Sequence, residues 1–361
     1  MSTHAAVVTA SIGGPLKVLQ VPTVPPTGDE VQVKVQWTAS TPLDLHQNDG
    51  GLLVTHPQVL GDGTAGTVVR VGDGVRRLRV GDKVFGFTWR TQKEKAHQEY
   101  CTAPEYFLAK LPANFSLQEA ITLPNNFVTV FHSLTTDLSL SLPWPRPENY
   151  IPEHAATPIL IWGGSSSVGQ YALQILKYYG YTNLLTTSST SHHSLLKSYG
   201  AKDTFDYRSP EIVPDILAAV PGGKIPFILD CIGSKYGSLA PLARIAKEGS
   251  RVAILLPVIL KDAGEGGVKP EYSMDVRAEA EWEVGVEARG VRTHFYLENP
   301  LFKEKLQPEI MPTLLAEGVV KPNRIRIVEG ETLLERAQRA MDALRRKEVS
   351  GERLVWRVSD E

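Results

Sequence analysis

Cysteine is scarce in this sequence: Cys101 and Cys231 are the only two among 361 residues, and they form no CxxC pair. Such a sequence cannot build a disulfide framework or a cysteine-based zinc cluster, since both need several suitably spaced cysteines. Few cysteines are typical of proteins that stay in a reducing compartment. We therefore expect a cytoplasmic protein.

An excess of charge of either sign is also missing, because 38 Lys and Arg stand against 40 Asp and Glu. A nearly neutral chain offers no basic field for nucleic acid. The sequence has no run of about 18 apolar residues that could span a bilayer, and its first ten residues, MSTHAAVVTA, do not resemble a signal peptide. We expect a small-molecule substrate and neither a nucleic-acid nor a membrane partner. The oligomeric state stays open between monomer and homodimer.

Short β-type runs separated by Gly, Pro and Asp fill the first part of the chain. The runs AAVV, VQVKVQW, GTAGTVVRVG, GDKVFGF and EYCTA all lie between residues 5 and 111. Many short strands with turn residues between them are typical of a small barrel-like β domain. Residues 135–158 then contain five prolines, which exclude regular helix and central strand over most of the stretch. We expect an irregular surface connection there.

Strands and helices alternate after this connection, which predicts an α/β fold with a parallel, doubly wound sheet. The expected strands cover 159–162, 184–187, 227–232, 251–256 and 291–296, and the expected helices cover 168–179 and 193–199.

Two later segments complete this pattern. The Gly-rich segment 261–276 follows a strand, and we expect a mobile loop there that is a candidate lid. The tail predicts an amphipathic helix over 333–344 and a strand over 354–358. We expect this last strand to return to the first domain.

A turn of small residues, GGSSSVG, connects the first strand of the α/β region to its first helix. Helix N-termini present unpaired N–H groups to phosphate, and small residues let the backbone approach closely. The strict G-x-G-x-x-G pattern is not met, because Ser166 stands at the middle glycine. The turn is a candidate phosphate cradle, with an ordinary tight connection as the alternative. Its residues are Gly163, Gly164, Ser165, Ser166, Ser167, Val168 and Gly169.

Acidic residues are absent from Gly163 through Lys202, where a site for NAD usually places a carboxylate on the ribose hydroxyls. The corresponding place reads TTSSTSHH. Hydroxyls and imidazoles can donate hydrogen bonds to a 2′-phosphate, so this stretch favours NADPH over NADH. The alternative is an exposed polar strand end, and we expect one of the two histidines to be plain surface. The polar residues are Ser188, Ser189, Ser191, His192 and His193.

Several longer stretches together resemble the medium-chain dehydrogenase/reductase superfamily over nearly the whole chain. They are LGDGTAGTVVRVGDGVRRLRVGDKVFGF, LAKLPANFSLQEAITLPNNFVTVFHSL, GGSSSVG, YGAKDTFDY and SGERLVWRV. The resemblance implies a GroES-like β-barrel catalytic domain over 1–125, a Rossmann cofactor-binding domain over 126–298, and a return to the catalytic domain over 299–361.

The zinc ligands of the metal-dependent members have no counterpart in this sequence. Gly61-Asp62-Gly63 stands where those members carry Gly-His-Glu, Ser40 stands near their Cys position, and their four-cysteine lobe is missing. Zinc requires thiolate and imidazole ligands. The chain therefore resembles the zinc-less members, close to the quinone oxidoreductases and the fungal trans-acting enoyl reductases, and the resemblance implies no metal site.

The resemblance also assigns roles to individual residues. His192 stands where quinone reductases often have Lys, and Tyr207 matches their tyrosine. By this resemblance, Ser165 to Val168 would contact the pyrophosphate, and Ser189, His192 and Tyr207 would contact the 2′-phosphate. Thr129 would contact the nicotinamide, and the backbone of Leu255 and Leu256 would contact its carboxamide. Ser350 would contact the ribose.

The stretch STPLDLHQ resembles Asn-Pro-Val-Asp-Trp-Lys of the family, with Thr41 in place of Asn and His46 in place of Lys. Two roles are open for His46. It could titrate near neutral pH and donate a proton to an enolate formed after hydride delivery. Alternatively, His46 braces the cofactor ribose or packs in the loop. We expect Asp44 to be a hydrogen-bond acceptor that fixes this loop.

The sequence thus predicts a metal-independent, NADPH-dependent oxidoreductase that passes hydride to a quinone or to an α,β-unsaturated carbonyl. Without a metal, catalysis would depend on positioning the acceptor and on donors such as His46 and Thr129. Two alternatives stay open at this point. One is a zinc-less alcohol or carbonyl dehydrogenase, and the other is a non-catalytic NADPH-binding protein.

Overall fold

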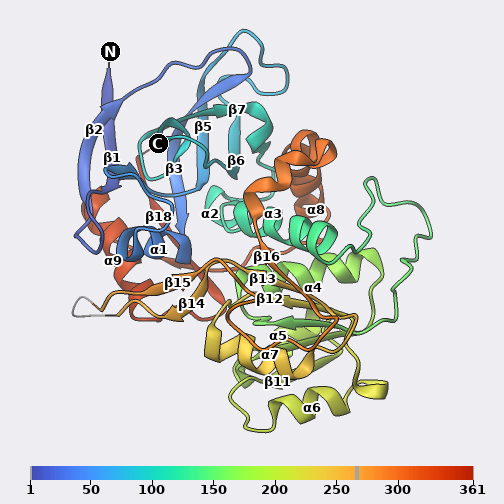
Figure 1. Cartoon of the computed structure of the whole chain (residues 1–361). Helices are drawn as coiled ribbons and strands as arrows, with labels where there is room; N and C mark the ends of the chain where they lie inside the picture. Colours follow the sequence, from blue (N-terminus) through green and yellow to red (C-terminus); the bar gives the residue numbers. More distant parts are fainter. Residues whose placement is uncertain (1, 265–267, 361) are drawn as a thin grey trace. The chain divides into compact units, whose positions relative to one another are not determined.

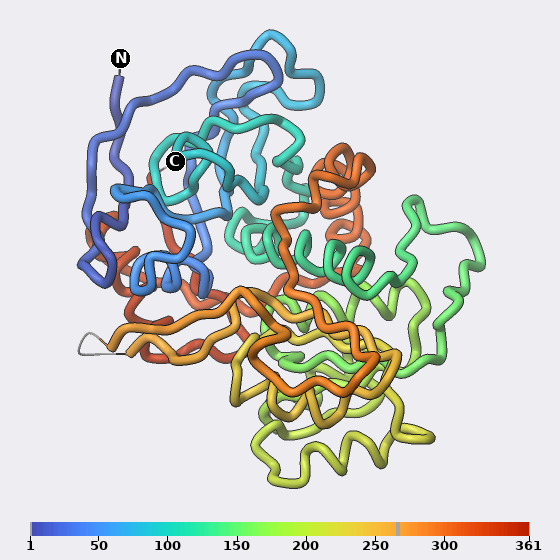
Figure 2. The backbone as a smooth tube through the Cα atoms, in the orientation of Figure 1, coloured from blue at the N-terminus to red at the C-terminus, as the bar shows by residue number. Residues whose placement is uncertain are grey.

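The computed structural model describes residues 2–264 and 268–360 (Figure 1). The chain forms two compact units, each built from separate segments of the sequence. The first unit comprises Met1–Asn125, Asp262–Pro270 and Leu297–Glu361, and the second comprises Asn126–Lys261 and Glu271–Tyr296. Figure 2 traces the backbone through these segments.

The first unit is built on β-sheets, as its short β-type runs separated by turn residues predict. One sheet has the order β17-β18-β3-β5-β6-β8, with β7 also pairing with β3, and a smaller sheet has the order β2-β1-β4. The strands are β1 Thr3–Thr9, β2 Lys17–Pro22, β3 Glu30–Ser40, β4 Gln58–Val59, β5 Gly63–Val71, β6 Lys83–Phe87, β7 Tyr100–Pro104, β8 Leu108–Lys110, β17 Arg324–Ile327 and β18 Glu352–Arg357.

The inward side chains of these strands form an apolar core. Val31, Val33, Val68 and Val84 are fully buried against one another and against Leu108. The spacing of two between Val31 and Val33 places both on one face of β3. This barrel-like β domain confirms the predicted architecture of the first part of the chain.

The tail returns to the first unit, as predicted. β18 runs antiparallel to β3, with Leu354 opposite Ser40. The helices of this unit are α1 Pro42–Gly50, α2 Leu117–Ala120, α8 Met311–Ala316 and α9 Leu333–Arg345, with 3-10 turns at Gln92–Glu94 and Glu105–Phe107 and a π-helical stretch at Phe302–Ile310. Within the unit, α9 packs against α1.

The second unit holds a parallel sheet with the order β11-β10-β9-β12-β13-β16. Counted along the chain, this order is 3-2-1-4-5-6, which defines the Rossmann fold and confirms the predicted doubly wound sheet. The strands are β9 Ile159–Trp162, β10 Leu184–Ser188, β11 Asp203–Asp206, β12 Phe227–Asp230, β13 Arg251–Leu255 and β16 Glu287–Val291.

Helices of the second unit pack against this sheet, and the apolar side chains between them form the core of the unit. Its helices are α3 Pro124–His132, α4 Ser167–Tyr179, α5 His193–Ser198, α6 Ile212–Ala218 and α7 Ala240–Ile245. Ile216 of α6 and Leu242 of α7 pack with Leu160 and Ile228 of the sheet. The alternate residues Ile159 and Ile161 point to the opposite face. The chain order reverses between β9 and β12, the position where Rossmann folds bind their ligands.

Two predictions about the second unit were wrong. The strand expected at 291–296 lies earlier, at Glu287–Val291, and a 3-10 helix follows at Thr293–Glu298. β16 is the last strand of the sheet, so charged residues such as Glu287 and Arg289 are tolerated there and weaken the hydrophobic signal.

The loop expected over 261–276 is instead framed by a hairpin of β14 (Val258–Lys261) and β15 (Glu271–Ser273). Strands of three or four residues are too short for a clear period of two. The part of the lid prediction that concerns residues 265–267 lies outside the described residues. No helix in the described ranges is both long and apolar enough to cross a membrane.

Candidate active site

The turn between β9 and α4 is held in place by the neighbouring strand. Gly163 has a φ of 85°, and its N–H donates to the Thr187 hydroxyl at 3.0 Å. The N–H of Gly164 donates to the Thr187 carbonyl at 2.8 Å. The Ser166 hydroxyl caps α4 by accepting from the N–H of Gly169 at 3.1 Å. These bonds orient the turn toward the carboxyl edge of the sheet.

Small residues are a steric requirement of this turn. A Cβ added to Gly169 would lie 2.5 Å from the Gly163 carbonyl oxygen and 2.7 Å from the Gly164 Cα. A Cβ on Gly164 would collide with the Thr186 hydroxyl. The backbone is thus left open at the N-terminus of a 13-residue helix, where N–H groups and the helix dipole favour an anion. The turn fits the pyrophosphate of a dinucleotide.

The residues predicted for the adenosine end lie at the carboxyl ends of β10 and β11. Ser188 is buried, and its hydroxyl donates to the Ser189 carbonyl at 2.9 Å, so it shapes the turn. The Ser189 hydroxyl lies 3.1 Å from the Ser191 hydroxyl. His192 is half-buried, and Tyr207 is 48% exposed.

A carboxylate that the sequence argument did not consider lies at the same edge. β10 and β11 pair in parallel with Ser188 opposite Asp206. Arg208 donates to both Asp206 oxygens, with Nε at 2.9 Å and Nη2 at 2.7 Å, and its backbone N–H donates at 3.0 Å. These bonds, with a contribution from the charge of His193, lower the pKa of Asp206 to about 2. The carboxylate is therefore ionised and paired.

Thr129, predicted for the nicotinamide, lies on α3 and is 9% exposed. Its hydroxyl lies 3.0 Å from that of Thr293, a residue that the sequence argument missed. Thr293 follows the carboxyl end of β16, so its position became apparent only when that strand was located. Leu255 is the last residue of β13 and Leu256 follows it, so both stand at the carboxyl end of this strand.

A second missed residue, Asp230, organises the turn after β12. Its carboxylate accepts from the N–H groups of Ile232 and Gly233 and from the Ser238 hydroxyl, at 2.9, 3.2 and 2.6 Å. Burial raises the pKa of this carboxyl to about 6. The Ile232 side chain then packs against Gly163. Asp230 therefore supports the phosphate cradle from the neighbouring strand.

His46 and Ser350 belong to the first unit. His46 lies on α1, and burial lowers its pKa to about 4, although the carboxylates of Asp262 and Asp49 act in the opposite direction. The expectation that His46 titrates near neutral pH was therefore wrong, since burial disfavours the charged imidazolium. Its imidazole is neutral at pH 7. Ser350 is exposed before β18.

Asp44 fixes the loop before α1, as predicted. One carboxylate oxygen accepts from the Thr41 N–H at 2.8 Å, and the other accepts from the Gly61 N–H at 3.2 Å. Burial raises the pKa of Asp44 to about 6. The helix that carries His46 is thereby tied to the Gly61-Asp62-Gly63 segment.

A buried polar cluster surrounds the segment where metal-dependent relatives carry ligands. Asp62 accepts from the Asn125 amide at 3.3 Å, and burial raises its pKa to about 6. Burial lowers the pKa of the Lys95 ammonium, which the charges of Asp62 and Asp44 oppose. Ser40 accepts from the Trp356 indole N–H at 2.9 Å. Among the residues that the structure describes, no three His, Cys, Asp or Glu side chains form a group that could hold a metal ion.

His97 packs in this cluster against Gly61 and against Trp356, with ring centroids 4.6 Å apart. Neither ring nitrogen has a hydrogen-bond partner in the described part of the chain. Burial lowers the pKa of His97 to about 3. In the unfolded chain His97 is protonated below about pH 6.5, whereas in the folded chain it stays neutral down to about pH 3. The free energy of unfolding therefore falls as the pH drops from about 6.5 toward 3.

We expect His97→Phe to remove this acid sensitivity. Between pH 7.5 and pH 5 the variant should lose about 2 kcal/mol less unfolding free energy than the wild type, because the folded-state pKa lies below this window. Urea unfolding at the two pH values measures the difference. His154→Phe changes a half-buried ring beside Phe227 and is the control. If wild type and His97→Phe lost the same free energy of unfolding between pH 7.5 and pH 5, the prediction would be contradicted.

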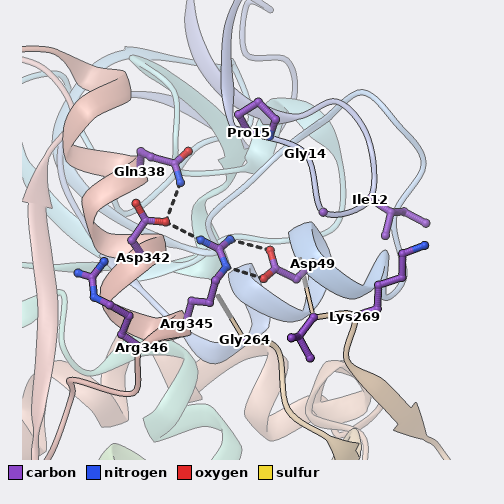
Figure 3. Close-up of a pocket in the computed structure, with 12 residues that line it drawn as sticks. Ile12, Gly14, Pro15, Asp49, Gly264, Lys269, Gln338, Asp342, Arg345 and Arg346 are labelled. Atoms are coloured by element: carbon purple, nitrogen blue, oxygen red, sulfur yellow. Dashed lines mark hydrogen bonds and ion pairs between the residues drawn. The ribbon is translucent and has the colours of Figure 1, made fainter. Parts of the chain in front are cut away.

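A cavity of about 590 Å³ lies within the first unit. Figure 3 shows the residues that line it. Arg345 of α9 forms its polar centre by donating to both oxygens of Asp49, at 2.7 and 2.8 Å. The wall includes Gly264, Val268 and Lys269. Its lining includes none of the residues predicted to bind cofactor, although Asp49 shares α1 with His46. We therefore do not place the chemistry in this cavity.

Comparison with known proteins agrees with this architecture. Residues 27–130 match the alcohol dehydrogenase GroES-like domain family. A trans-enoyl reductase of Fusarium sp. (strain FN080326) is 30% identical over 96% of this chain and 98% of its own length. The enoyl reductase component of lovastatin nonaketide synthase from Aspergillus terreus is 29% identical over 91% of this chain and 89% of its own length.

Solved structures share the fold over nearly the full chain. The CurK enoyl reductase has a TM-score of 0.74 at 18% identity, with 98% of this chain and 99% of that chain covered. The quinone oxidoreductase from Coxiella burnetii has a TM-score of 0.72 at 21% identity, with 99% of this chain and 100% of that chain covered. The chain belongs to the medium-chain dehydrogenase/reductase superfamily, within its zinc-less branch, which confirms the resemblance noted in the sequence. As such it is an oxidoreductase that uses a nicotinamide cofactor.

Proposed function

We propose that this protein reduces an α,β-unsaturated carbonyl compound or a quinone with hydride from NADPH. The observation that carries the proposal is the 30% identity, over nearly the full length of both chains, to a protein named a trans-enoyl reductase. The phosphate cradle at the β9–α4 turn supports the use of a dinucleotide. The serines and histidines after β10 support the choice of NADPH.

NADPH would supply the hydride, and the residues of this chain would bind and orient it. The cradle from Gly163 to Gly169 would hold the pyrophosphate through backbone N–H groups. Ser189, His192 and Tyr207 would bind the 2′-phosphate, Thr129 and the backbone of Leu255 and Leu256 would orient the nicotinamide, and Ser350 would contact the ribose.

Reduction of a conjugated carbonyl places negative charge on the carbonyl oxygen, and reduction of a quinone does the same. Hydrogen-bond donors aimed at that oxygen lower the barrier most effectively in a water-poor site. We assign this donor role to His46 and Thr129. The neutral imidazole of His46 donates an N–H hydrogen bond, and holding the acceptor in place contributes through proximity. These donors would stabilise the negative charge on the oxygen, a role that zinc has in the metal-dependent relatives.

The first experiment follows NADPH oxidation by chelator-treated protein against a panel of quinones and conjugated enones, with NADH in parallel. Turnover on either class with NADPH supports the proposal and identifies the acceptor. NADPH binding without turnover on any acceptor would favour a non-catalytic nucleotide-binding protein. Stoichiometric zinc in untreated protein, together with alcohol oxidation, would favour a dehydrogenase. The cytoplasmic location and the oligomeric state stay predictions from the sequence.

His46 offers a sharper test of the mechanism. We expect His46→Ala to lower kcat by about tenfold, the cost of one hydrogen bond to a charged oxygen. His46→Asn keeps an N–H donor and should retain most of the activity. Because the His46 pKa lies near 4, the wild-type and His46→Asn pH profiles of kcat should run parallel between pH 6 and 8. A break in this range that disappears in His46→Asn would show instead that an imidazolium donates the proton.

A further inference from the structure

Carboxylates are absent between Gly163 and Lys202, which favours NADPH over NADH. The fold brings one in from outside that range, because Asp206 lies directly opposite Ser188 in the parallel pairing of β10 with β11. An unpaired carboxylate at this position would repel a 2′-phosphate and would accept hydrogen bonds from ribose hydroxyls, as in sites for NAD. The charge of Asp206 must therefore be counterbalanced if NADPH binds.

Arg208 supplies this counterbalance through a forked ion pair. Its Nε and Nη2 groups occupy both oxygens of Asp206, and its guanidinium carbon lies 5.8 Å from the centre of the Tyr207 ring. Within the described ranges its Nη1 group makes no hydrogen bond. A guanidinium has five N–H donors in a planar fork, so one edge can hold a carboxylate while the other stays available for a phosphate.

We propose that Arg208 is a specificity-determining residue that neutralises Asp206 and donates from its free edge to the 2′-phosphate of NADPH. It would supply the cation that quinone reductases often carry as Lys at the position of His192. The inference rests on the proposed use of NADPH. It makes the choice between NADPH and NADH depend on a pair of residues at the end of β11, in addition to the serines after β10.

The test compares two fragments of the cofactors by isothermal titration calorimetry on the full chain: adenosine 2′,5′-bisphosphate and AMP. Wild type should bind the bisphosphate more tightly. Arg208→Gln should reduce that preference by at least about tenfold, the worth of one charge-assisted hydrogen bond, and should not weaken AMP binding, because the unpaired Asp206 carboxylate can accept from ribose hydroxyls. The double variant Asp206→Asn/Arg208→Gln should recover part of the preference, because Asp206→Asn removes the carboxylate that Arg208→Gln exposes.

Arg251→Gln is the control, since Arg251 is a partly exposed arginine of the same sheet, 3.8 Å from Glu287, at the amino end of β13. It should leave both affinities as in wild type. A wild type that binds the two fragments equally would overturn the NADPH proposal and this inference with it. A wild type that prefers the bisphosphate, combined with an unchanged preference in Arg208→Gln, would overturn this inference alone.

Discussion

Replacing Gly169 by alanine is expected to weaken the binding of NADPH and NADH alike by about a hundredfold, which corresponds to the loss of one or two hydrogen bonds to a charged group. The added Cβ would lie within 2.7 Å of backbone atoms of Gly163 and Gly164. Backbone atoms cannot rotate away as a side-chain tip can, so the turn itself must shift. Both cofactors contain the pyrophosphate, so both should lose affinity, as measured by calorimetry.

Gly237→Ala is the control for this change. Gly237 belongs to the same unit, and its added Cβ would approach only the Ser234 side chain, at 3.0 Å from the hydroxyl oxygen. This variant should bind cofactor like wild type. If Gly169→Ala bound both cofactors normally while remaining folded by circular dichroism, the β9–α4 turn would not be the pyrophosphate site.

Asp44→Ala should destabilise the fold by about 3 kcal/mol at pH 5, because it leaves two buried N–H groups, those of Thr41 and Gly61, without an acceptor. The cost should be smaller at pH 7.5, by about 1.5 kcal/mol. The reason is that the folded-state pKa of Asp44 is raised to about 6 from 3.8. The folded chain therefore holds this proton more tightly, and its advantage declines as the pH rises from about 4 to 6.

Urea unfolding of wild type and variant at both pH values measures this effect. Asp82→Asn is the control, since Asp82 accepts from the Arg79 N–H in a partly exposed turn of the same unit, and it should cost less than 1 kcal/mol. A destabilisation by Asp44→Ala that stayed constant between the two pH values would contradict the assigned shift in pKa.

The architecture was largely predictable because its signals are local. Short β-type runs separated by Gly, Pro and Asp predicted the strands of the first unit, and the alternation of apolar strands with helices predicted the parallel sheet. The failures came where the local signal is weak. The strand β16 lies at a sheet edge and carries Glu287 and Arg289, and the hairpin strands β14 and β15 are too short to show a period.

The candidate site was predictable only in part, for a related reason. The turn from Gly163 to Gly169 is contiguous in the sequence, so its small residues could be recognised together. Thr293 and Asp230 could not, because each contributes through a hydrogen bond or a packing contact with a distant segment. The clearest signal that could have found them is their place just after, or at the end of, a parallel strand.

The sequence by itself determined the fold class, the small-residue turn proposed to bind phosphate, the absence of zinc-type ligands at 61–63, and the resemblance to the superfamily, since each depends on residues close together in the chain. Only the tertiary structure decided the charge balance of the site. Strand register placed Asp206 beside Ser188, and packing buried His46 so that its imidazole is neutral at pH 7. Burial and register arise from contacts between distant segments, which no local pattern contains.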